Sequence, residues 1–151
     1  MSVTVETVER PSVDPLVAVK AAAELAELRR LRAVAAAAAA GRTQVDIADK
    51  LGVSQPAVHK MLVRARHTRE LFVTQPWEVA LRYAAGEIDR DTMLATFLAW
   101  PWTVDQVLDL NADNPLSEAF VRGSWSDLVR ATRHGYVTLE DYQVIFERPD
   151  A

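Results

Sequence analysis

The sequence has no cysteine, little glycine and proline, and no long apolar run. The absence of cysteine excludes disulfides, thiol chemistry and cysteine-based zinc sites, and it is typical of proteins from a reducing cytoplasm. Five glycines and seven prolines, against 50% hydrophobic and 25% charged residues, exclude a disordered or collagen-like chain. The alanine-rich run at residues 33–40 is much shorter than the ~20 residues of a membrane-spanning helix. We therefore expect a folded cytoplasmic protein, with its 151 residues in one domain or two small ones.

Charge is unevenly distributed along the chain. The net charge of -4 argues against a nucleic-acid partner if it is taken alone, because such proteins need a basic surface. Residues 1–75, however, carry 11 basic and 8 acidic residues, whereas residues 76–151 carry 6 basic and 13 acidic residues. The first part therefore has a net charge of +3 and the second a net charge of -7. Six basic and two acidic residues lie at 42–69, so a locally basic segment precedes an acidic one.

The N-terminal part predicts a tail followed by a long helix. Residues 1–13 have no helical period and are expected to be flexible or extended, without the apolar segment of a signal peptide. Asp14 is a typical N-cap and Pro15 a typical first helical residue. Good helix formers then continue to Ala40, and Gly41 is expected to end the helix. Its leucines and alanines form a stripe, which we expect to be a dimer interface, with the C-terminal helices as the alternative.

Two shorter helices are predicted next, at Gln44–Leu51 and from Ser54 to about Arg69. Gly52 is expected to end the first of them and Ser54 to cap the second. Pro76 then marks a boundary, because helices rarely continue into the residue before a proline. Residues 14–73 are therefore expected to form one domain.

Residues 76–151 form an acidic part that contains a weak internal repeat. When Gly86 is aligned with Gly135, the candidate N-cap Asp89 aligns with Thr138, and an apolar period follows each cap. Each unit predicts two helices in a short αα-hairpin. No segment alternates as a strand would, so we expect an all-α fold: a long helix and two shorter ones, followed by a small acidic helical domain of two αα-hairpins. Between the hairpins we expect a short helix near Val104–Leu110 and a polar loop at Asn111–Pro115.

The segment Gln44–Val63 has the spacing of two helices that cross at a fixed angle. Ala48 is small where the helices would meet, and Gly52 lies where a positive φ is needed. Apolar residues occupy the positions that would lock the helices together, namely Ile47, Leu51, Val53, Val58 and Met61. This segment resembles the helix–turn–helix of bacterial and phage transcriptional regulators. With the long helix before it and the acidic helices after it, the chain is similar to small actinobacterial regulators and antitoxins.

The resemblance implies that the helix beginning at Ser54 enters the major groove of DNA and that the preceding helix crosses the backbone. Its exposed face would carry the base-reading residues Gln55, Pro56, His59, Lys60 and Val63. Glutamine suits adenine and lysine suits the acceptors of guanine, whereas His59 is equally well explained as a solvated residue. Phosphate contacts are expected from Arg42, Thr43, Gln44, Ser54, Arg64 and Arg66.

Other chemistry is poorly represented, and we expect neither an enzyme nor a cofactor. Three scattered histidines without cysteine give no metal-ligand spacing, and His67 and His134 are expected at the surface. Acidic pairs after Pro76 fall at predicted helix starts, where capping explains them. The aromatic residues of this part are expected in its core rather than around a ligand.

We therefore expect a sequence-specific regulator of transcription that binds double-stranded DNA as a homodimer, acts as a repressor and associates with the nucleoid. Two alternatives are open. In one, the acidic part binds and neutralises a protein partner, as an antitoxin does, while the basic part regulates its own gene. In the other, the acidic part binds a small effector that shifts the DNA-binding equilibrium.

Overall fold

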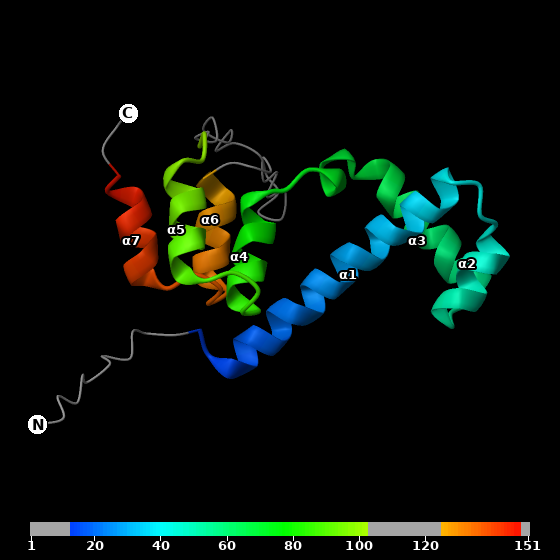
Figure 1. The fold of residues 1–151 in the computed structure, drawn as a ribbon, viewed down its shortest axis with the longest axis horizontal. Helices are drawn as coiled ribbons and strands as arrows, with labels where there is room; N and C mark the ends of the chain where they lie inside the picture. Colours follow the sequence, from blue (N-terminus) through cyan, green and yellow to red (C-terminus); the bar gives the residue numbers. More distant parts are fainter. Residues whose placement is uncertain (1–12, 103–124, 149–151) are drawn as a thin grey trace, which may run out of the picture.

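A computed structural model describes residues 13–102 and 125–148, in which all regular secondary structure is helical and no strand occurs (Figure 1). The expected all-α class is therefore confirmed for these ranges. The helices are α1 Pro15–Ala39, α2 Gln44–Leu51, α3 Gln55–His67, the 3-10 helix η1 Arg69–Phe72, α4 Pro76–Ala84, α5 Arg90–Leu98, α6 Trp125–Arg133 and α7 Leu139–Phe146. The predicted tail up to residue 12, the short helix near 104–110 and the loop at 111–115 lie outside the described residues.

The long helix α1 begins and ends as predicted. The Asp14 side chain accepts a hydrogen bond of 2.8 Å from the backbone N–H of Leu16, and Pro15 occupies the first turn, where its missing N–H costs nothing. The helix ends at Ala39, just before Gly41. Its 25 residues span roughly 37 Å at 1.5 Å per residue. This length lets α1 extend from the side of α4 to α2 and α3 (Figure 1).

Helix α1 packs against two groups of helices. Its N-terminal half contributes Ala21 and Leu25 to a large core with α4, α5, α6 and α7, which we call the C-terminal lobe. Its C-terminal half contributes Val34 to a smaller core with α2 and α3, which we call the α2–α3 lobe. Leu31 lies between them, in contact with α3 and η1 through Ala65 and Leu71. The apolar stripe of α1 is therefore buried within the chain and is not free to bind a second copy.

The C-terminal lobe repeats one local pattern twice. The N–H of Gly86 donates to the carbonyl of Tyr83 after α4, and the N–H of Gly135 donates to that of Thr132 after α6. Both glycines have a positive φ, of 83° and 78°, which closes the last turn of each helix. The side chains of Asp89 and Thr138 then cap α5 and α7, as predicted. Helix α4 contacts α5 and α6 contacts α7, around a core that includes Phe97, Tyr136 and Ile145.

Ion pairs hold the C-terminal lobe together and attach α1 to it. Arg90 of α5 binds Asp141 of α7 at 2.7 Å, and the Asp141 side chain is only 3% exposed. Arg32 of α1 binds Glu78 of α4 through both of its terminal nitrogens, at 2.8 and 2.7 Å. The least exposed charges of these pairs, the carboxylates of Glu78 and Asp141, are thus each neutralised by an arginine of another helix. Among the described residues, no helix is both long enough and apolar enough to cross a membrane.

Candidate nucleic-acid interface

Helices α2 and α3 are joined by a tight turn that begins at a left-handed glycine. The Thr43 hydroxyl accepts the N–H of Asp46 to cap α2, and the Ser54 hydroxyl accepts the N–H of Ala57 to cap α3. Gly52 has φ +67°, a conformation that costs an L-residue about 1–2 kcal/mol. The predicted bounds of α2, its end at Gly52 and the cap at Ser54 are confirmed, whereas the cap at Thr43 was not predicted.

The second helix ends earlier than the sequence predicts. Helix α3 stops at His67, whereas the helical pattern extends to about Arg69. The hydroxyl of Thr68 donates 3.0 Å to the carbonyl of Arg64, and the chain then turns into η1. Side-chain bonds of threonine to the backbone compete with helix continuation, which accounts for the earlier end.

A small apolar core fixes the angle between α2 and α3. Val58 is fully buried, and Ile47, Ala48 and Leu62 are nearly so, together with Val34 of α1. Met61 is half-buried against the same cluster. Leu51, however, is 40% exposed, so this leucine packs less closely than its position in the sequence predicts.

The residues predicted to read bases lie together on the opposite face of α3. Gln55, Pro56, His59, Lys60 and Val63 are all exposed. At about 100° per residue they share one face, to which Arg66 also belongs. Arg64 lies roughly a third of a turn away, on the flank of the helix. The packing of Val58 and Leu62 on the core therefore turns this face, which is polar except for Pro56 and Val63, toward solvent.

The first residues of the two helices are in contact. The side-chain amide of Gln55 donates to the side-chain oxygen of Gln44 at 3.4 Å. This bond joins a residue predicted to read bases with a residue predicted to contact phosphate. The Gln44 amide nitrogen keeps its own donors, because only its oxygen is used here.

The remaining residues predicted to contact phosphate fall into two groups. Thr43 and Ser54 use their hydroxyl oxygens as acceptors in the caps, which leaves each O–H able to donate to a phosphate. Arg42, in contrast, binds Asp46 at 2.6 Å, and the bond lowers the pKa of Asp46 and raises that of Arg42. The positive charge of Arg42 is thus balanced inside α2.

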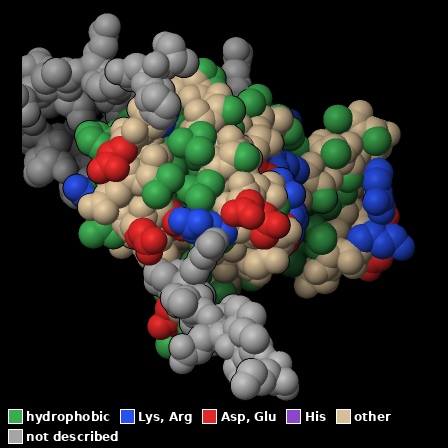
Figure 2. Space-filling view, turned by 60° about the vertical axis from the view of Figure 1, so that its left-hand side comes forward, with side chains coloured by type: hydrophobic (Ala, Val, Ile, Leu, Met, Phe, Trp, Pro, Cys, Tyr) green, Lys and Arg blue, Asp and Glu red, His purple; other side chains and the backbone are tan. Residues whose placement is uncertain are grey.

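Basic side chains without a partner are concentrated in this lobe. Within the described ranges, most lysines and arginines form an ion pair, a hydrogen bond or a contact with an aromatic ring. The side chains of Lys50, Lys60, Arg64, Arg66 and Arg133 form none of these contacts with the described residues, and the first four belong to α2 and α3. Figure 2 shows basic side chains along the outer edge of the α2–α3 lobe, at the right of the view.

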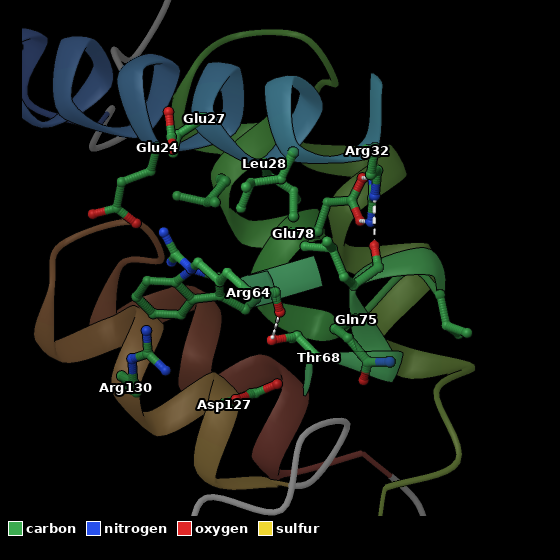
Figure 3. A pocket seen from close by; sticks show the side chains of 15 residues that line it. Glu24, Glu27, Leu28, Arg32, Arg64, Thr68, Gln75, Glu78, Asp127 and Arg130 are labelled. Carbon is green, nitrogen blue, oxygen red and sulfur yellow. Dashed lines mark hydrogen bonds and ion pairs between the residues drawn. The ribbon is translucent and has the colours of Figure 1, made fainter. Parts of the chain in front are cut away.

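A pocket that the sequence did not predict lies between the two lobes. It has a volume of about 440 Å³ and is lined by α1, by α3, by the segment that links α3 to α4, and by α4 and α6. Arg64, on the flank of α3, and Arg130 of the C-terminal lobe both line it (Figure 3). Trp77 of α4 also belongs to its lining. The guanidinium of Arg130 lies 3.8 Å from the centre of the Trp77 ring.

Tyr136 and the histidines occupy the places expected of them, whereas Phe146, expected in the core, is 65% exposed at the end of α7. Tyr136 is fully buried in the C-terminal core, where its hydroxyl donates 2.7 Å to Glu24 of α1, and burial raises its pKa. His59 and His67 are exposed on α3. His134 is at the surface beside Trp77 and Lys20, and partial desolvation lowers its pKa.

Comparison of the chain with protein-family models, curated proteins and solved structures gives no match. We therefore argue its function from its own residues and contacts.

Proposed function

We propose that this protein is a sequence-specific regulator of transcription that binds double-stranded DNA through α2 and α3, which act as a helix–turn–helix. The unpaired lysines and arginines carry this proposal. Most described basic residues outside α2 and α3 have partners, whereas the side chains of Lys50, Lys60, Arg64 and Arg66 form no ion pair or hydrogen bond within the described residues. A cation without a protein partner is available to replace the counterions of a phosphate backbone.

The exposed face of α3 then lies in the major groove, with its N-terminal residues toward the base edges. Gln55 suits the N6 and N7 atoms of adenine, and Lys60 suits the O6 and N7 atoms of guanine. The bond between Gln44 and Gln55 supports this arrangement, because it restricts the rotamers of a side chain that must be held in place to discriminate bases. Thr43, Ser54 and the helix N-termini approach the phosphates on either side.

We propose a homodimer that represses transcription. One recognition helix reads few base pairs, so a second copy one DNA turn away is needed for specific affinity. Because the stripe of α1 is buried, the candidate dimer surface is the exposed apolar face of α7 that carries Leu139 and Phe146, which are seven residues apart. Repression needs only occupancy of the promoter, whereas activation needs a further contact with the polymerase.

The test is the selection of duplexes from random double-stranded DNA, followed by titration at fixed salt. The wild-type protein is expected to bind the selected duplex at least about a thousandfold more tightly than random DNA. The double variant Gln55→Ala, Lys60→Ala should lose this preference and still fold, because both side chains are exposed and each specific contact contributes about 1–3 kcal/mol.

Arg133→Ala provides the matched control, because Arg133 is an exposed basic residue of the C-terminal lobe with no partner among the described residues. It should leave both the affinity and the preference unchanged. Discrimination that survives in the double variant, or is lost in Arg133→Ala, would contradict the proposal.

A further inference from the structure

The pocket between the lobes brings the proposed recognition helix and the C-terminal lobe to the same cavity. Its volume of about 440 Å³ lies in the range of small-molecule sites. Arg64 of α3, Thr68 directly after α3 and Arg130 of α6 line it (Figure 3). Trp77 of α4 also belongs to its lining. A molecule bound here would touch both lobes at once.

One part of the pocket wall is apolar. Leu31, Leu71 and Leu81 are nearly buried and line it together with Leu28 and the Trp77 ring. Such a wall favours a ligand with an aromatic or aliphatic body, because each square ångström of apolar surface removed from water contributes about 25 cal/mol.

The acidic groups of the wall already have partners. Glu78 is held by both terminal nitrogens of Arg32, Glu27 pairs with Arg30 at 2.9 Å, and Glu24 accepts the hydroxyl of Tyr136 at 2.7 Å. Asp127 also has an interaction of its own. These carboxylates are therefore poorly disposed to recognise a cationic ligand.

Arg64 differs from them. Its backbone carbonyl accepts the hydroxyl of Thr68, but its guanidinium has neither an ion pair nor a hydrogen bond with the described residues. Its five N–H donors point to a planar anion, which can accept two of them at once.

We propose that this pocket binds a small carboxylate with an apolar body, that Arg64 binds the carboxylate, and that binding weakens the hold of α3 on DNA. The binding of the carboxylate concerns the pocket alone, whereas its effect on DNA binding rests on the proposed function. Arg64 is also a predicted phosphate contact, and a carboxylate bound to it removes its positive charge from the DNA interface. The expected loss of DNA affinity is about three- to tenfold, the value for one phosphate contact.

Phenylacetate is a suitable probe, with phenylacetamide and phenethylamine as neutral and cationic analogues of the same shape. In a titration followed by NMR, phenylacetate at millimolar concentration should shift the side-chain signals of Arg64 Nε–H and Trp77 Nε1–H. The amide and the amine should bind at least about tenfold more weakly, because they lack the charge-assisted bond. No binding of phenylacetate, or equal binding of the three probes, would contradict the proposal that the pocket binds a carboxylate.

Arg64→Gln and Arg66→Gln form a matched pair for this experiment. Both residues are exposed arginines of α3, but only Arg64 lines the pocket. Arg64→Gln should lower the affinity for phenylacetate about ten- to hundredfold, whereas Arg66→Gln should leave it unchanged. Equal losses in the two variants would show that the charge of α3, and not the pocket, attracts the probe.

The coupling is read by repeating the DNA titration with saturating phenylacetate. The affinity of the wild-type protein for DNA should fall, and the dependence of this affinity on salt concentration should decrease by about one released counterion. The DNA affinity of Arg64→Gln should not change when phenylacetate is added. If phenylacetate binds and the DNA affinity does not change, the coupling is overturned and the proposed function stands. If no duplex is bound at all, the proposed function fails, together with the coupling, while the NMR titration still decides the pocket.

Discussion

The α2–α3 lobe and the C-terminal lobe use their charged residues differently. In the C-terminal lobe, Arg90 and Asp141 pair with each other below the surface, and Arg32 of α1 reaches across to Glu78. In the α2–α3 lobe, Lys60 and Arg66 face solvent without a described partner. Side chains that stabilise the fold are thus largely separated from those that are free to bind. The net charge of -4 conceals this division, because it adds the +3 of residues 1–75 to the -7 of residues 76–151.

The first prediction concerns the buried ion pair of the C-terminal lobe. Arg90→Leu should lower the free energy of unfolding by about 3 kcal/mol, because it leaves the buried carboxylate of Asp141 without its partner. Urea denaturation of the purified variant measures the loss. Arg133→Leu is the control, and as an exposed arginine outside the described ion pairs it should change stability by less than about 0.5 kcal/mol. Equal effects of the two variants would show that the buried pair contributes nothing.

The second prediction compares one turn in each lobe. Gly52→Ala and Gly86→Ala should each cost about 1–2 kcal/mol, because both glycines have a positive φ and an added Cβ would meet no atom within 4 Å. The strain should therefore be similar in the two lobes. Only Gly52→Ala should also weaken DNA binding, since its turn sets the angle of α3. A matched loss of DNA affinity in Gly86→Ala would contradict the division between the lobes.

The smallest effect is expected from pH. Desolvation, followed by the charges of Lys20 and Arg130, lowers the pKa of His134 in the folded protein. The unfolded chain therefore takes up the proton more readily, so this residue costs stability as the pH falls below about 6.5 and costs nothing above it. His134→Gln should reduce the loss of unfolding free energy between about pH 7 and pH 5. An unchanged or steeper loss of unfolding free energy in the variant would contradict the prediction that His134 lowers stability at acidic pH.

Local signals in the sequence predicted the helices and their ends well. Asp14, Gly52 and Asp89 act on backbone groups within a few residues of themselves, so their roles as helix caps follow from the residues next to them in the sequence. The face of α3 also followed, because Val58 and Leu62 repeat at helical spacing.

Contacts between distant parts of the chain could not be predicted in the same way. The spacing of the leucines in α1 shows that one face is apolar, but not that α4 and α3 cover it. Likewise, nothing near Arg64 in the sequence indicates that Trp77 and Arg130 lie across a pocket from it. Such juxtapositions depend on how the lobes dock, which is set by many weak contacts at once.

The most direct test of the account is a map of the DNA contact on the protein. Backbone amide signals of ¹⁵N-labelled protein would be followed by NMR while the duplex selected from random DNA is added. The account predicts the largest shifts at the N-terminus of α2, around Gln44, and along the exposed face of α3, around Gln55 and Lys60, with little change in α5 and α7. Shifts concentrated in the C-terminal lobe, or no response to any duplex, would contradict it.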